Sequence, residues 1–271
     1  MRRVADALRR ARELGVARLD AQLLLGHHLK QPRAWLLAHD DALLDTALAA
    51  AVAADLERRA AGEPLAYLVG EREFHGLLLQ VSPAVLVPRP ETELLVDWAI
   101  EVLEDRLAAV VDLGTGSGAI ALAVKHRCPA ATLTATDASA AALAIAEGNA
   151  GRLGLAVEFT AGDWWQPLAG RRFDLALSNP PYIAGGDAHL RALTHEPQAA
   201  LTPGGDGLAA LRCIIAGAPQ HLRAGAWLLL EHGYDQAAAV RQLLIDSGFA
   251  EANTRHDLAG LPRCTGARWP G

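Results

Sequence analysis

The sequence predicts an α/β protein, with a doubly wound, mostly parallel sheet preceded by a small all-helical domain. In the first 60 or so residues, apolar side chains recur at helical spacing and no β-rich segment is present. From about residue 91, short apolar runs that end in turn residues alternate with helical stretches, which is typical of parallel strands joined by crossover helices. A segment rich in Pro and Gly lies between these parts. We therefore expect a helical domain over residues 1–75, a hairpin linker over 76–90 and the sheet domain over 91–271.

Composition and charge narrow the class of protein. The chain has 271 residues, of which 51% are hydrophobic and 21% charged, which excludes intrinsic disorder and leaves enough apolar material for a packed core. Its 25 basic and 31 acidic residues give a net charge of -6, whereas a broad nucleic-acid-binding face is normally basic. The charge is uneven, because the first 18 residues hold six arginines against two acids, a local balance of +4.

Cysteine usage and the apolar runs indicate the cytoplasm. Cys128, Cys213 and Cys264 are far apart and have no metal-ligand spacing, so we expect three reduced thiols and no metal site. The basic N-terminus lacks the apolar run of a signal peptide. No stretch reaches the roughly 18 uninterrupted apolar residues of a membrane span. We therefore expect a cytoplasmic protein that does not contact a membrane.

Four helices are predicted in the first domain. The first is indicated by four apolar residues at helical spacing, Val4, Leu8, Ala11 and Leu14. Asp20 is expected to cap a second helix, and Pro32 precedes a third. Asp45 starts a long Ala-rich helix that Gly62 is expected to end. A small bundle of this kind suits either a recognition module or a stabilising cap.

The second domain reads as alternating strands and helices. The expected strands are 107–114, 131–137, 156–163, 173–179 and 225–233, with a closing pair at 249–257 and 262–269. The expected helices are 92–103, 118–127, 139–154, 208–222 and 236–248. In such open sheets, ligands bind at the carboxyl ends of the strands.

A glycine-rich loop follows the first of these strands and opens a helix. It consists of Gly114, Thr115, Gly116, Ser117 and Gly118. Glycines there permit a tight turn and the close approach of a ligand to the helix N-terminus. The next strand ends at Asp137, where a carboxylate can accept both hydroxyls of a ribose. Together with Asp112, the pattern resembles the S-adenosylmethionine site of class I methyltransferases; a nicotinamide enzyme or a structural turn are the alternatives.

The third strand ends in Gly162, Asp163 and Trp164. In methyltransferases of this fold, an acid at this place commonly faces the adenine amino group and the next side chain packs on the ring. Trp164 is well suited to stack against adenine, although a core position is the alternative. The neighbouring Trp165 points elsewhere and is expected to pack in the core or on the surface.

The fourth strand ends in Asn179, Pro180, Pro181 and Tyr182, which is the most specific signal in the chain. The prolines fix the backbone and remove two donors, so the turn offers carbonyl oxygens. A planar NH2 group could donate one hydrogen to the Asn179 side-chain oxygen and the other to the Pro180 carbonyl, with Tyr182 lying flat over it. This arrangement would orient a poor nucleophile toward a methyl donor.

The motifs together resemble those of the peptide chain release factor N(5)-glutamine methyltransferases. The match runs over nearly the whole chain and includes 63–67, 88–93, 112–122, 179–182, 204–208, 231–233 and 257–260. The resemblance implies that S-adenosylmethionine is bound by 114–118, Asp137, Trp164 and Asn179, and becomes S-adenosylhomocysteine. It also implies that Asn179 to Tyr182 hold the glutamine amide of the Gly-Gly-Gln motif in bacterial class 1 release factors. Asn179, Pro180 and Tyr182 are the catalytic candidates, and the helical leader would help to dock the partner.

Several other residues have weaker claims. Arg89, Glu91 and Glu93 either cap a helix or shape a pocket, and Glu196 either lines the substrate opening or is solvated. His232 ends a strand, but the reaction does not obviously need a general base. His27 and His28 lack the spacing of a metal site.

Two other functions use the same signals. A nucleic acid adenine methyltransferase can use the same four-residue motif, but it needs a basic cleft for a flipped base. The catalytic half of this sequence is acidic and shows no clear sign of such a cleft. A cofactor-sensing module without turnover is the non-enzymatic alternative, and the intact motif argues against it. We therefore expect no sequence-specific nucleic acid binding.

Overall fold

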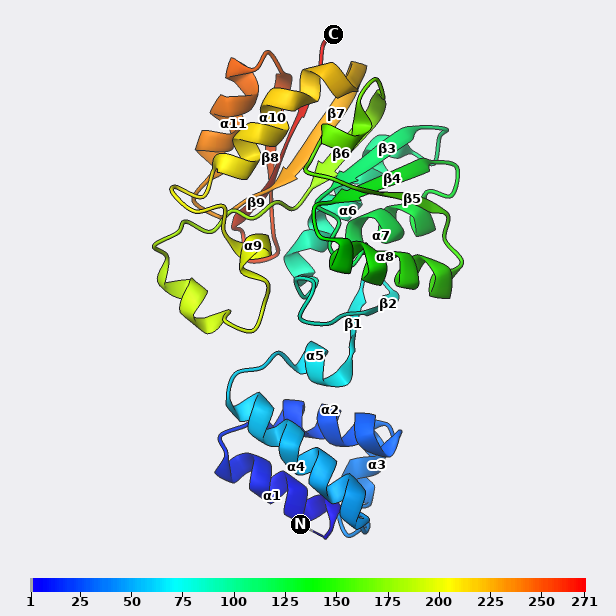
Figure 1. The fold of residues 1–271 in the computed structure, drawn as a ribbon, viewed down its shortest axis with the longest axis vertical. Coiled ribbons are helices and arrows are strands. Elements are labelled where there is room, and N and C mark those ends of the chain that lie inside the picture. Colours follow the sequence, from blue (N-terminus) through cyan, green and yellow to red (C-terminus); the bar gives the residue numbers. More distant parts are fainter. Residues whose placement is uncertain (1) are drawn as a thin grey trace. The chain divides into compact units, whose positions relative to one another are not determined.

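The computed structural model describes residues 2–271, which form two compact units (Figure 1). The first unit ends at Glu71 and the second runs from Arg72 to Gly271.

The first unit is a bundle of helices. These are α1 (Val4–Glu13), α2 (Arg18–Leu29), α3 (Arg33–Ala38), α4 (Thr46–Ala60) and the short α5 (Leu65–Val69). Its core is built from apolar side chains at helical spacing, among them Val4, Leu24, Leu25, Leu36, Val52 and Leu56. The expected cap at Asp45 is confirmed, because its carboxylate accepts a hydrogen bond from the Leu48 N–H at 2.8 Å.

The cap expected at Asp20 is wrong. Helix α2 begins at Arg18, and Ala17 occupies the capping position. The Asp20 carboxylate accepts a hydrogen bond from Nε of Arg59 on α4 at 2.8 Å. A charged partner from another helix has therefore taken the oxygen that a cap would have used, and the sequence of α2 alone could not reveal it.

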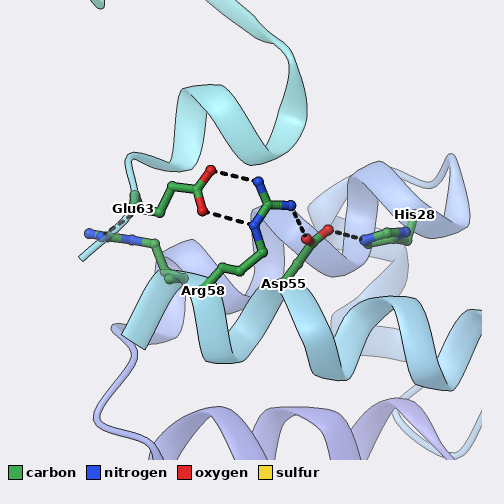
Figure 2. Close-up of polar contacts among 5 residues, drawn as sticks. His28, Asp55, Arg58 and Glu63 are labelled. Carbon is green, nitrogen blue, oxygen red and sulfur yellow. Dashed lines mark hydrogen bonds and ion pairs between the residues drawn. The ribbon is translucent and has the colours of Figure 1, made fainter. Parts of the chain in front are cut away.

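A chain of polar contacts joins α2, α4 and the segment before α5 (Figure 2). Nε and Nη2 of Arg58 donate to the Glu63 carboxylate at 2.8 and 2.6 Å. Nη1 of Arg58 donates to Asp55 at 3.0 Å, and the second oxygen of Asp55 lies 2.8 Å from Nε2 of His28. Arg58 is half-exposed, and exposed ion pairs contribute little to stability. We therefore infer that these pairs mainly fix the orientation of the helices relative to each other.

The second unit starts with a hairpin. Strands β1 (Glu71–Phe74) and β2 (Leu77–Gln80) flank a turn at His75 and Gly76, both of which have positive φ. The hairpin therefore begins before the segment 76–90 in which the sequence analysis placed it. Asn149 attaches it to a helix of the sheet domain, because its amide bonds both the N–H and the carbonyl of Gln80, at 2.7 and 3.0 Å.

The seven-stranded sheet is mostly parallel, as expected. Its strands are β3 (Ala109–Leu113), β4 (Thr132–Asp137), β5 (Val157–Ala161), β6 (Phe173–Ser178), β7 (Leu222–Glu231), β8 (Ala250–His256) and β9 (Pro262–Arg268). The order is β5-β4-β3-β6-β7-β9-β8, and only β9 runs antiparallel to its neighbours β7 and β8. The chain moves outward from β3 to β4 and β5 and then returns to the other side of β3 with β6. A ligand crevice is expected at that switch point.

Helices cover both faces of the sheet (Figure 1). They are α6 (Glu93–Leu103), α7 (Ala119–Arg127), α8 (Ala140–Leu153), α10 (Ala209–His221) and α11 (Ala237–Asp246), with shorter turns η1 (Pro90–Thr92), η2 (Gln166–Leu168), η3 (Ala188–Ala192) and α9 (Gln198–Leu201). Successive residues of β3 point to opposite faces. Val110 packs in the core with residues of α6 and α7, and Val111 packs in the core with residues of α10 and α11. The continuous apolar runs in the sequence reflect this burial on two sides.

Candidate active site

A cavity of about 400 Å³ lies at the carboxyl ends of β3, β4 and β6. Most of the residues that were expected to bind a cofactor line this cavity. They are Gly114, Thr115, Gly116, Ser117, Asp137, Trp164 and Asn179. Gly118 is the exception, because it does not belong to the lining. A Cβ at Gly118 would lie 2.9 Å from Leu122 and 3.2 Å from Ala146, so this glycine permits close helix packing.

The glycine loop is held by backbone hydrogen bonds to the neighbouring strand. The N–H groups of Gly114 and Thr115 both donate to the Thr136 carbonyl at 2.9 Å. Gly114 and Gly116 have φ of +74° and +57°, a region that favours glycine. A Cβ at Gly114 would lie 3.1 Å from the Trp164 ring. The loop therefore brings bare backbone to the cavity wall.

Asp112 lies beneath the loop and not in the cavity lining. It is fully buried, and one oxygen accepts hydrogen bonds from the Thr115 hydroxyl at 2.6 Å and the Ala121 N–H at 3.3 Å. The other oxygen has no hydrogen-bond partner within the part of the chain that the structure describes. Burial raises the pKa of Asp112 to about 7. Asp112 thus fixes the loop from behind.

Asp137 places a carboxylate at the cavity edge. One oxygen accepts from the Gly116 N–H and the other from the Ser139 N–H, each at 2.8 Å. A carboxylate oxygen has two lone-pair sites, so both oxygens keep capacity for a further donor. Two adjacent hydroxyl groups of a ligand match this acceptor pair.

The two neighbouring tryptophans have different environments. Trp164 borders the cavity and has a φ of +46°. Trp165 is buried, donates from Nε1 to the Ile214 carbonyl at 2.9 Å, and stacks on His221 with ring centroids 4.9 Å apart. Of the two places expected for Trp165, the core and the surface, the structure shows the core.

A second cavity of about 270 Å³ adjoins the first. Pro180 and Tyr182 line the second cavity and Pro181 lines the first, whereas Asn179 and Arg89 line both. The turn after β6 therefore contributes to both cavities, and Asn179 is a lining residue that they share.

The Asn179 amide has a defined hydrogen bond. Its Nδ2 donates to Oγ1 of Thr92 at 3.1 Å, which directs Oδ1 to the opposite side of the amide group. An acceptor oxygen in that place can receive a hydrogen from a planar NH2 group, as the sequence analysis suggested.

Two side chains beside the turn were given no role from the sequence, although both lie in segments of the family match. They are Thr92, which is buried before α6, and Glu231, which is buried at the end of β7. Tyr182 donates from its hydroxyl to Oε1 of Glu231 at 3.3 Å. Burial raises the pKa of both partners, that of Glu231 to about 7. The sequence did contain a signal for Glu231, since an acid ends an apolar strand beside the strand that carries Asn179.

The weaker candidates are also placed. Arg89 lines both cavities and pairs with Glu196, which is buried and belongs to neither lining. Glu91 lines the second cavity, and Glu93 accepts a hydrogen bond from the His75 N–H at 3.0 Å. His232 is buried, its Nε2 lies 2.7 Å from the Thr265 hydroxyl, and burial lowers its pKa. It belongs to neither cavity lining, so its contacts indicate packing.

Within residues 2–271, no group of three or more His, Cys, Asp or Glu side chains is arranged to hold a metal ion. No helix in that range has the length and apolar character needed to cross a membrane.

Two family models match the chain. The PrmC N-terminal domain matches residues 1–70, and the Methyltransferase small domain matches residues 92–210. The release factor glutamine methyltransferase of Bordetella pertussis is 54% identical over 256 residues, covering 93% of this chain and 95% of that protein. A protein of the same name from Xylella fastidiosa strain Temecula1 is 51% identical over 260 residues, with 94% of each covered.

A solved structure shares the fold. It is a 16S rRNA N2 methyltransferase of T. thermophilus in complex with AdoMet and guanosine, with a TM-score of 0.56 and 20% identity. The match covers 73% of this chain and 49% of that one. The sequence similarity to the two curated relatives thus extends over both units, and the likeness to the solved structure concerns the fold alone.

Proposed function

Because the chain belongs to the family of release factor glutamine methyltransferases, we propose that its first cavity holds S-adenosylmethionine and its second a release factor glutamine. The chain is an S-adenosylmethionine-dependent protein-glutamine N-methyltransferase. It methylates the side-chain amide of the glutamine in the Gly-Gly-Gln motif, and S-adenosylhomocysteine is the second product. The observation that carries the assignment of the cavities is the position of Asn179, which lines both.

The first cavity fits the cofactor in size and chemistry. Its volume of about 400 Å³ lies in the range of small-molecule sites. The backbone at Gly114 and Gly116 allows close approach, Asp137 offers two acceptor oxygens to ribose hydroxyls, and Trp164 offers an aromatic surface to adenine. When bound, S-adenosylmethionine supplies an electrophilic methyl group on a sulfonium.

The turn after β6 is proposed to orient the acceptor. An amide NH2 group can donate one hydrogen to Oδ1 of Asn179 and the other to the Pro180 carbonyl, while Tyr182 bounds the second cavity. Amide nitrogen is a weak nucleophile, so holding it in line with the methyl group accounts for much of the rate. The N–CH3 bond forms as the S–CH3 bond breaks, and the nitrogen then releases a proton. No general base is needed before transfer.

The helical unit is proposed to recognise the partner. Its first 18 residues hold the local charge of +4, and the arginines there are exposed. Such a cluster suits an acidic protein surface, because surface charges mainly set encounter rate and orientation. We therefore propose bacterial class 1 release factors as substrates, action in the cytoplasm and no sequence-specific binding of nucleic acid.

Mass spectrometry tests the proposal directly. The protein is incubated with methyl-labelled S-adenosylmethionine and a class 1 release factor, in parallel with single-stranded and duplex DNA. One methyl group on the glutamine of Gly-Gly-Gln is expected, and none on DNA. Absence of label from the release factor, or transfer to DNA adenine, would overturn the proposal.

A further inference from the structure

Arg263 reaches the second cavity from the antiparallel strand of the sheet. Parallel strands place their carboxyl ends at the ligand edge, and β9 runs in the opposite direction, so its first residues lie beside the carboxyl end of β7. There Glu231 pairs with Cys264, and the Arg263 carbonyl accepts a hydrogen bond from the His232 N–H at 2.9 Å. Arg263 therefore lines the second cavity.

The Arg263 guanidinium is held from outside the cavity. Its Nε donates to Oδ2 of Asp257 at 2.8 Å. The other oxygen of Asp257 accepts from the N–H groups of Ala259 and Leu261, each at 2.9 Å, and so fixes the turn between β8 and β9. Asp257 belongs to neither cavity lining. The position of the guanidinium is thus set without using the cavity.

The outer nitrogens of Arg263 are left for a ligand. The bond to Asp257 is the only hydrogen bond that the guanidinium makes within residues 2–271, so the N–H groups of Nη1 and Nη2 remain as donors. The side chain is 19% exposed, and a charged donor that is partly removed from water makes a stronger hydrogen bond than an exposed one. Arg263 therefore offers preoriented donors to the second cavity.

The lining of the second cavity suits a neutral polar ligand. It combines the basic Arg89 and Arg263 with the acidic Glu91 and Glu231, and its other side chains outside the turn 179–182 are apolar. A lining of both signs does not favour an anion, but it matches a peptide backbone, which carries carbonyl acceptors and N–H donors. In a Gly-Gly-Gln segment, two residues have no side chain, so only their backbone can be recognised.

We propose that Arg263 binds substrate, by donating hydrogen bonds from its outer nitrogens to a backbone carbonyl oxygen of the Gly-Gly-Gln segment. This inference rests on the proposed function, which places the release factor glutamine in the second cavity. It gives Arg263 a contact with the peptide and Asp257 the role of a positioning residue that acts through Arg263.

Three variants and a matched control test this contact. Arg263→Met removes the donors and keeps an apolar stem, and Arg263→Lys keeps the charge but loses the planar fork. Asp257→Asn can keep the acceptor that fixes the turn while it replaces the one that holds Nε. Arg255→Met is the control, because Arg255 lies opposite Cys264 on the neighbouring β8 and pairs with Glu101, but belongs to neither lining.

The steady-state constants should separate substrate binding from chemistry. Arg263→Met should raise KM for a release factor about ten- to a hundredfold, as expected for the loss of a charged hydrogen bond. Its kcat should change less than about threefold, because the backbone is held equally before and during methyl transfer. Arg263→Lys and Asp257→Asn should raise KM less. The control should keep the wild-type KM, and all variants should keep the wild-type affinity for S-adenosylhomocysteine.

A short Gly-Gly-Gln peptide shows whether the contact is with the backbone. Its kcat/KM should fall in Arg263→Met by the same factor as that of the release factor. Peptides in which one carbonyl oxygen at a time is replaced by sulfur, a weaker acceptor, identify the bonded group. At one position the replacement should lower kcat/KM for the wild-type protein several-fold and have no further effect in Arg263→Met, because both changes remove one interaction.

The outcomes distinguish this inference from the proposed function. Wild-type KM in Arg263→Met, a loss on the release factor without one on the peptide, or strictly additive effects at every carbonyl would each overturn the backbone contact. Methylation of the release factor by the wild-type protein would leave the function intact in all three cases. A wild-type protein that does not methylate the release factor would instead overturn the proposed function, and this inference with it.

Discussion

Nη2 of Arg89 lies 2.5 Å from Oε1 of Glu196, although the two residues are 107 positions apart in the sequence. The second oxygen of Glu196 accepts a hydrogen bond from the Val87 N–H at 3.1 Å. A single buried carboxylate thus fixes the segment that contributes Arg89 to both cavities. Of the two roles expected for Arg89, capping and pocket shaping, its place in both linings favours the second. Glu196 was expected to line the substrate opening or to be solvated, but it is buried and belongs to neither lining, so it supports Arg89 from behind.

The first prediction concerns the asymmetry of this pair. The Glu196 side chain is 2% exposed and that of Arg89 is 36% exposed. Arg89→Met leaves a buried carboxylate with one backbone donor, and should lower the free energy of unfolding by about 2–4 kcal/mol. Glu196→Gln leaves a guanidinium that can turn toward water, and should cost about 1 kcal/mol. Urea denaturation at pH 7.5 measures both, and the reverse ranking would contradict this account of the wall.

The second prediction concerns Asp137 and the cofactor. Asp137→Ala removes both acceptor oxygens at the cavity edge, and should weaken binding of S-adenosylmethionine by about 1–3 kcal/mol. Isothermal titration calorimetry measures the loss. The Gly116 and Ser139 N–H groups also lose their acceptor in this variant, so its thermal unfolding is compared with that of wild type at saturating cofactor. Unchanged affinity would remove Asp137 from the cofactor site.

The third prediction separates catalysis from cofactor binding. Asn179→Ala deletes the proposed acceptor for the substrate amide, and should lower kcat by about 10²–10³, as the loss of one positioned group commonly does. Affinity for S-adenosylhomocysteine should stay within about twofold, because Asn179 is one of many residues that line the first cavity. Stopped-time assays with labelled cofactor and calorimetry provide the two numbers. Near-normal turnover would mean that the motif is scaffolding.

Many helices and strands of this fold are determined by short stretches of sequence, and these elements could be predicted. Apolar runs ending at Leu113, Asp137 and Asn179 show strands, and helical spacing between them shows crossovers, so the parallel sheet and its ligand edge follow. The roles of the individual glycines do not follow. Gly118 resembles a ligand contact in sequence, and only the packing of Leu122 and Ala146 against it shows why it lacks a side chain.

The parts that escaped prediction depend on contacts between distant segments. Thr92 precedes α6 and accepts a hydrogen bond from Asn179 after β6, whereas Glu231 ends β7 and accepts one from Tyr182. The second contact forms because β7 lies next to β6 in the sheet. The sequence alone suggests that Asp20 caps a helix, but in the structure its carboxylate accepts a hydrogen bond from Arg59. A sequence pattern gives the class of a residue and its place on an element, but the partner across the fold decides whether a carboxylate caps, supports or orients.

The fourth prediction is a pH dependence of stability. The pKa of Glu231 is about 7 in the folded protein and ordinarily 4.5, so the folded state holds a proton that the unfolded state loses first. Folding stability from this group is therefore lost as the pH rises from about 4.5 to 7. Glu231→Gln cannot titrate, so its stability relative to wild type should increase between pH 5.5 and 8 by about 1–2 kcal/mol.

Urea unfolding at the two pH values gives this difference and cancels the other titrating groups, such as His232. Asp112→Asn should behave in the same way, because burial raises the pKa of Asp112 to about 7 as well. A pH-independent difference between wild type and Glu231→Gln would contradict the burial argument for Glu231.

The last prediction tests partner recognition by the helical unit. Arg12 and Arg18 are exposed, and reversing both to Glu should raise KM for a full release factor roughly fivefold or more at low salt, since opposite charges steer encounter. High salt should shrink the difference, because screening weakens exposed charges beyond about 8–10 Å. A short Gly-Gly-Gln peptide, which lacks the rest of the release factor surface, should be a poor substrate for both proteins and show no difference. Reversing the exposed Arg106 and Arg127 of the second unit makes the same change in net charge and should leave KM unaltered. Equal effects of the two double reversals would mean that net charge acts, and that the helical unit does not select the partner.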